Sequence, residues 1–115
     1  MQNNFKNIEF LKKVTTHDYE SFLKLKPLPP FSLEILEYLN ALSKQINKEP
    51  NIEEFSDVRT FAFFCRKANL VILKKRYHDS SLLKLGRGLV FHIAPSNVPV
   101  NFAFSLMISL LSGNS

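Results

Sequence analysis

The chain has 115 residues, which is enough for one small domain and too short for two. Its composition, 45% apolar and 22% charged with three glycines and six prolines, excludes collagen-like, low-complexity and disordered chains. A single cysteine excludes an internal disulfide and a cysteine-rich zinc site, and it favours a reducing, cytoplasmic location. The net charge of +5 permits an anionic partner without identifying one.

The charged residues are distributed unevenly along the chain. All of them lie at or before Arg87, and the stretch from Gly88 to Ser115 contains only His92 as a titratable side chain. The amino terminus has no apolar stretch behind a basic start, so no signal peptide is expected. The sequence therefore divides into a charged, mainly helical segment over residues 1–85 and an apolar segment over residues 86–115.

The first third of the chain contains three short signals. Apolar residues at helical spacing predict a short amphipathic helix, namely Phe5, Ile8, Leu11 and Val14. The alternation of leucine and lysine over residues 23–26 is typical of a strand. The three prolines between residues 27 and 30 then predict an extended connection.

Two longer helices are predicted next. Ser32 is a suitable N-cap, Glu34 follows in the first turn, and Pro50 ends the helix. Its apolar stripe consists of Ile35, Leu36, Leu39, Leu42 and Ile46, with Asn40 and Ser43 outside it. The second helix is expected over Asp57 to Arg76, with a basic last turn that complements the helix dipole.

The side chains most often found in catalytic or metal sites do not form a site in this segment. Cys65 lies in the apolar stripe of the second helix, where burial would raise its pKa, so we expect a structural cysteine. The three histidines, His17, His78 and His92, show no metal-ligand spacing, and we expect no metal.

The apolar segment predicts a strand, a turn and a helix. Residues 89–93 form a short apolar run that is broken by the turn over residues 94–97. Pro99 suits the first turn of a helix that continues to Leu111, and Gly113 is placed to end it. Such a unit is typical of a parallel α/β sheet, in which ligands gather at the carboxyl ends of the strands.

This last helix carries more apolar surface than the chain can cover. Its polar residues, Asn101, Ser105 and Ser109, form a thin line, and large apolar side chains occupy the other positions. Burial of each such side chain contributes about 2 kcal/mol. We therefore expect a sheet to cover the helix, and hence that these residues are the leading piece of a larger α/β protein. A membrane span is the less favoured alternative, since the prolines and Asn97 would leave backbone groups unpaired near its middle.

Two stretches of the sequence support a resemblance to a known family. Residues 86–99 read Gly-Arg-Gly-Leu-Val-Phe-His-Ile-Ala-Pro-Ser-Asn-Val-Pro, and residues 110–114 read Leu-Leu-Ser-Gly-Asn. Together they closely resemble the acyl-CoA reductase family, the fatty acid reductases of bacterial bioluminescence with relatives in non-luminous bacteria. Residues 61–70 resemble the helix that precedes this motif, so the resemblance covers about residues 32–115. More distantly, residues 95–99 and 113–114 are similar to motifs of the aldehyde dehydrogenases.

The resemblance implies a two-domain enzyme whose nucleotide-binding domain begins in residues 86–115 with an incomplete, Rossmann-type unit. It implies reduction of a fatty acyl-CoA or acyl-protein thioester to the aldehyde by NADPH, through an acyl-enzyme on a catalytic cysteine. The amide of Asn97 would donate to the oxyanion. The backbone of four residues would lie along the NADP cofactor: Ile93, Ala94, Pro95 and Ser96. Acyl-transferring enzymes are implied partners, and the full-length enzyme is expected to be oligomeric, without nucleic acid or membrane.

This sequence departs from the family pattern in two ways. The catalytic cysteine of the family would lie well beyond Ser115, and Cys65 does not match it. The Lys-Pro segment expected soon after Gly113 and Asn114 is also missing. We therefore expect no reductase activity from these residues by themselves. The alternative function is a small basic interaction module that binds nucleic acid or an acidic protein, with an affinity for nucleic acid that falls steeply with salt.

Overall fold

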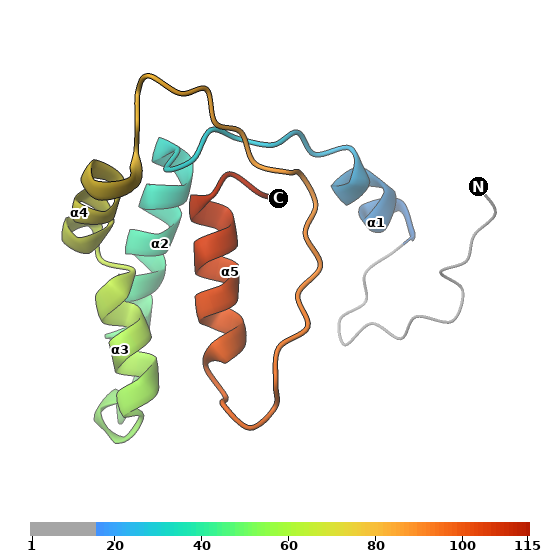
Figure 1. Cartoon of the computed structure of the whole chain (residues 1–115). Helices are drawn as coiled ribbons and strands as arrows, with labels where there is room; N and C mark the ends of the chain where they lie inside the picture. Colours follow the sequence, from blue (N-terminus) through green and yellow to red (C-terminus); the bar gives the residue numbers. More distant parts are fainter. Residues whose placement is uncertain (1–15) are drawn as a thin grey trace.

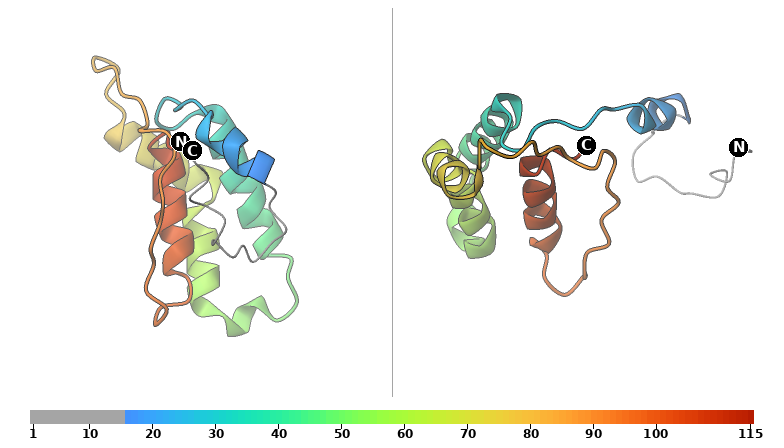
Figure 2. Two further views of the ribbon diagram at one scale, coloured as in Figure 1. Left: turned by 90° about the vertical axis from the view of Figure 1, so that its right-hand side faces the viewer. Right: turned by 45° about the horizontal axis from the view of Figure 1, so that its top comes forward.

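The computed structural model describes residues 16–115. In chain order these contain α1 (Thr16–Leu23), α2 (Leu33–Ile46), the 3-10 helix η1 (Ile52–Glu54), α3 (Ser56–Phe64), α4 (Lys67–Tyr77) and α5 (Asn101–Leu111). Helices α2 to α5 lie together, whereas α1 stands apart at the end of an extended connection (Figures 1 and 2). The predicted helix over Phe5 to Val14 lies outside the described residues. The predicted strand over residues 23–26 is wrong, because Leu23 completes α1 and a turn follows.

Helix α2 forms over the predicted stripe. Leu36 and Leu39 are buried, and the remaining apolar residues of the stripe pack against the same core. Two details differ from the prediction. Ser32 stands at the N-cap but its buried hydroxyl makes no hydrogen bond. Ser43, expected outside the stripe, is buried, and its hydroxyl donates to the carbonyl oxygen of Ala62 at 2.6 Å.

The single helix predicted over Asp57 to Arg76 is wrong, because the structure has two helices there. Helix α3 ends at Phe64, and Arg66 takes an extended conformation with φ −64° and ψ 140°. The side-chain oxygen of Asn40, on α2, accepts a hydrogen bond from the backbone N–H of Lys67 at 3.0 Å. A cap supplied by another helix thus satisfies the first N–H of α4 and stabilises the break.

The break rotates the apolar face of the chain. Phe61, Cys65 and Leu70 are buried, whereas Val71 and Ile72, the next two residues of α4, are exposed. The basic last turn of α4 is as predicted, since Lys74, Lys75 and Arg76 all lie within it.

Helix α5 lies against this group of helices and completes the core. The fully or nearly buried members of the core come from α2, α3, α4 and α5 and from the residues that join them: Leu36, Leu39, Phe61, Cys65, Leu70, Val100, Met107 and Leu111. The ring of Phe104 packs edge-on against Phe61, with 5.2 Å between centroids. Other apolar side chains of α5 stay outside this core, since Phe102 and Ile108 are more than half exposed.

Gly113 ends α5 as predicted. It has a φ of +88°, and the backbone N–H groups of Gly113 and Asn114 donate to the carbonyl oxygens of Leu110 and Ser109. This pattern is the Schellman motif, in which a left-handed residue satisfies the last carbonyl groups of a helix.

Three segments that are far apart in the sequence meet at this end of α5. Leu28 donates its backbone N–H to the carbonyl oxygen of Gly113 at 2.8 Å and accepts from the N–H of Gly86 at 3.1 Å. Phe31 donates to Leu111 at 2.8 Å. The backbones approach so closely that a Cβ atom at Gly86 or at Gly113 would overlap a neighbouring carbonyl oxygen. We refer to residues 26–31, 86–90 and 111–115 as the glycine junction.

The expected strand over residues 89–93 does not form a ladder in the described part of the chain. The segment is extended and runs alongside α5 in the opposite direction (Figures 1 and 2). A strand needs a neighbour to pair its backbone groups, and residues 16–115 supply only Ser115 for this purpose. Of the predicted α/β arrangement, the described residues therefore show the helical first part, the turn and the last helix, but not the strand.

Candidate functional site

The five residues predicted to form a site lie on the turn that leads into α5. Ile93 ends the extended segment, and Ala94, Pro95, Ser96 and Asn97 follow it. All five are exposed, and the turn forms one end of the molecule (Figure 1). The structure therefore presents the carboxamide of Asn97 and the backbone of the other four residues on one accessible surface.

The turn is held at its carboxyl end by burial. Val100 belongs to the core, and its carbonyl oxygen accepts the backbone N–H groups of Ala103 and Phe104 at 3.0 and 3.3 Å. The N–H of Asn101 donates to the carbonyl oxygen of Val98 at 3.1 Å. The turn therefore enters α5 through a fixed backbone, and a substitution at Val100 would move Asn97 as well as the core.

The approach to the turn is held by the polar line of α5. Nδ1 of His92 lies 2.8 Å from Oγ of Ser105. At the other end of the helix, the amide of Asn114 donates to Oγ of Ser109 at 3.1 Å and its oxygen accepts the N–H of Arg87 at 2.7 Å. Two of the three polar residues on α5 thus attach the extended segment to the helix.

The sequence predicted this polar line but not its hydrogen bonds to the extended segment. The interval of four residues places Ser105 and Ser109 on one face of a helix, and His92 shares the period of two with the inward-facing Val90. The spacing of four on α5 and the alternation of two in the extended segment could together have indicated a hydrogen bond between the two segments. The partner of each residue depends on the register between segment and helix, which no local pattern contains.

Cys65 is not part of this surface. Its side chain is fully buried, and Sγ lies 3.5 Å from Sδ of Met107. Burial raises the pKa of the thiol to about 11. A thiol with that pKa is almost entirely protonated at neutral pH, and the thiolate is the reactive form. The prediction of a structural cysteine is confirmed.

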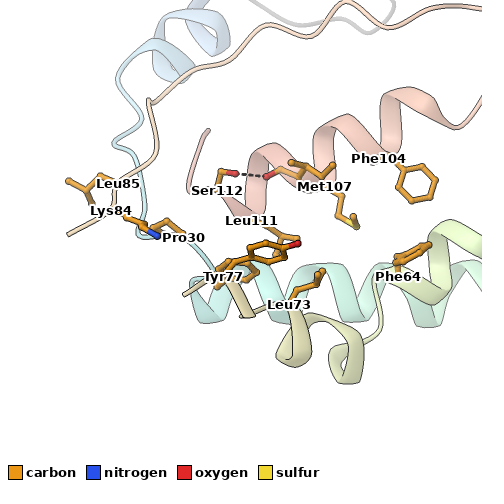
Figure 3. Close-up of a pocket in the computed structure, with 12 residues that line it drawn as sticks. Pro30, Phe64, Leu73, Tyr77, Lys84, Leu85, Phe104, Met107, Leu111 and Ser112 are labelled. Carbon is orange, nitrogen blue, oxygen red and sulfur yellow. Dashed lines mark hydrogen bonds between the residues drawn. The ribbon is translucent and has the colours of Figure 1, made fainter. Parts of the chain in front are cut away.

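Two apolar grooves flank α5. The larger, with a volume of about 830 Å³, lies between α5 and α4 and includes Phe64, Tyr77 and Phe104, with Lys84 at its margin (Figure 3). The smaller, with a volume of about 560 Å³, lies between α5 and the helices α2 and α3. Pro99, next to the turn, contributes to the smaller groove, but residues 93–97 line neither.

The described residues contain no group of three or more His, Cys, Asp or Glu side chains placed to hold a metal ion. Within the same residues, no helix combines the length and the apolar character that crossing a bilayer requires.

The chain matches the model of a known protein family. The family model described as Acyl-CoA reductase (LuxC) matches residues 2–115. Searches of curated proteins and of solved structures found no match. The family match spans almost the whole chain and includes both the turn and the polar line of α5. The chain therefore belongs to the LuxC family of acyl-CoA reductases.

Proposed function

We propose that this chain supplies the oxyanion-binding turn of an enzyme that reduces a fatty acyl thioester to the aldehyde. The observation that carries the proposal is the match to the acyl-CoA reductase family over residues 2–115. The exposed position of Asn97, three residues before the buried Val100, supports it, because an amide on a fixed turn can donate to a carbonyl oxygen as negative charge develops there.

The reaction also needs a nucleophile. The family resemblance implies an acyl-enzyme on a cysteine, and Cys65 is unsuited to that role because it is buried and its pKa is raised to about 11. We propose that the catalytic thiol comes from outside these 115 residues, and that by themselves they have no reductase activity. The substrate would be an acyl-CoA or acyl-protein thioester, delivered in part by acyl-transferring enzymes, and the complete enzyme would be oligomeric.

We propose that the residues of the turn lie along one side of an NADP cofactor. The backbone of Ala94 to Ser96 is exposed, and the apolar side chain of Ile93 offers surface to a ring or a ribose. The region after Arg87 contains no Lys or Arg, so the cations that would pair with the phosphates must come from elsewhere. NADPH, when bound, supplies the hydride for the reduction. In this proposal residues 86–115 begin its binding domain.

A chimera tests the function of the turn. Residues 2–115 would replace the matching segment of an active acyl-CoA reductase of the same family, and NADPH oxidation would be followed with a panel of acyl-CoA thioesters. We expect an active chimera in which Asn97→Ala lowers kcat by about 10²–10³ with little change in KM. Asn47→Ala, which removes a carboxamide at the end of α2, is the matched control and should leave kcat unchanged. Full kcat in the Asn97→Ala chimera would contradict the proposal.

A further inference from the structure

The turn that carries Asn97 is stiff within itself but has few attachments to the rest of the molecule. Pro95 and Pro99 each fix one φ angle and restrict the residue before them. Apart from the bond between Val98 and Asn101, no backbone hydrogen bond joins residues 91–98 to the rest of the described chain. Such a turn keeps its shape, and its orientation depends on how its two ends are held.

Val100 holds one end of the turn, and His92 holds the other. Val100 is buried in the core. Among residues 91–99 as the structure describes them, His92 has the one side chain that is not exposed. Its Nδ1 lies 2.8 Å from Oγ of Ser105 on α5. Within the described chain, no other side chain of residues 91–97 makes a hydrogen bond.

The hydroxyl of Ser105 is directed to this contact. Ser112, on the same helix, donates its hydroxyl to the carbonyl oxygen four residues earlier, as serines in helices often do. The hydrogen bond of the Ser105 hydroxyl is instead with His92. The contact does not need a particular tautomer, because a bare Nδ1 accepts from the hydroxyl and a protonated Nδ1 donates to it.

We propose that His92 is a positioning residue for Asn97 in the reduction of the acyl thioester. The inference rests on the proposed function, in which the amide of Asn97 donates to the oxyanion. Held at Val100 alone, the turn would pivot about its carboxyl end and carry the amide away from the reacting oxygen. A displacement of about 1 Å in a reacting group can lower a rate by about 10²-fold. His92 therefore acts through Asn97 and not as an acid or base.

The test uses the chimera in which residues 2–115 replace the matching segment of an active acyl-CoA reductase. His92→Phe keeps an aromatic ring but removes Nδ1, and it should lower kcat by about tenfold or more with little change in KM. Ser105→Ala removes the partner and should have a similar effect. His78→Phe, which replaces an exposed histidine after α4, is the matched control and should leave kcat unchanged. Circular dichroism would verify that the variants keep their helices.

Two further readouts distinguish positioning from a general structural role and from acid–base chemistry. The carboxamide of His92→Asn places a polar atom near the position of Nδ1 but does not titrate, so this variant should recover most of the lost kcat. The double variant His92→Phe/Asn97→Ala should be no slower than Asn97→Ala alone, because the position of the turn matters only while the amide is present.

The outcomes separate this inference from the proposed function. Full kcat in His92→Phe, no recovery in His92→Asn, or additive losses in the double variant would each overturn the positioning role. If Asn97→Ala still lowered kcat in the same series, the proposed function would stand without it. Full kcat in Asn97→Ala would contradict the proposed function, and the inference with it.

Discussion

The three glycines of the glycine junction differ in backbone conformation and in the space around them. Gly88 has a φ of +92° with open space around it, and Gly113 has a φ of +88° with the carbonyl of Leu28 directly against it. Gly86 faces the carbonyl of Gly113 without a positive φ. Alanine at these positions therefore introduces strain at Gly88, overlap at Gly86, and both at Gly113.

The expected losses of stability follow from these differences. An alanine held in the left-handed backbone conformation destabilises the folded state by about 1–2 kcal/mol. Replacing glycine by alanine also lowers the conformational entropy of the unfolded chain, which offsets about 0.4–1 kcal/mol of that loss. Gly88→Ala should therefore lower the free energy of unfolding by about 1 kcal/mol. Gly113→Ala must also displace Leu28, which makes two backbone hydrogen bonds worth about 1 kcal/mol each, so its loss should be about 3 kcal/mol. Gly86→Ala should fall between the two.

Urea unfolding followed by circular dichroism measures these losses. We expect the midpoint to fall in the order Gly88→Ala, Gly86→Ala, Gly113→Ala, with an unchanged dependence on denaturant. If Gly113→Ala were no less stable than Gly88→Ala, the close approach of Leu28 would contribute nothing and the reasoning would be refuted.

Two further predictions concern buried side chains. Ser43→Ala should lower the free energy of unfolding by about 1–3 kcal/mol, because the carbonyl oxygen of Ala62 loses its buried hydrogen-bond partner. The control Ser112→Ala removes an exposed hydrogen bond and should change the free energy of unfolding little. Equal urea midpoints for the two variants would contradict this prediction. Cys65 should resist a thiol reagent at pH 8 until the chain opens, and rapid labelling of the folded chain would show that it is accessible. Because its pKa is raised from 9.0 to about 11, the stability that the neutral thiol contributes should persist below pH 9 and be lost as the pH rises toward 11. The Cys65→Ala variant, measured in parallel, should lack that part of the decline.

Local patterns predicted the features that local physics determines. Helix α2 follows from the stripe between Ser32 and Pro50, and the end of α5 follows from Gly113, since both depend on residues within a few positions. The exposed turn at Asn97 follows from its prolines. The burial of Cys65 follows from its place in an apolar stripe.

The features that sequence reasoning missed depend on partners far along the chain. The break before α4 is capped by Asn40, 27 positions from Lys67, so the stripe over residues 57–76 contained no sign of it. Ser43 is buried because Ala62 supplies an acceptor across the helix pair. The segment over residues 89–93 has the composition of a strand, but composition does not supply a neighbour to pair with it.

The glycine junction also affects the order in which the fold assembles. Lys26 and Ser115, which approach within hydrogen-bonding distance there, are 89 positions apart. The contacts among α2, α3 and α4 close much shorter loops, so they can form while α5 is still being synthesised. The segment around Leu28 must wait for Gly113, and the docking of α5 is therefore expected to be a late event in folding.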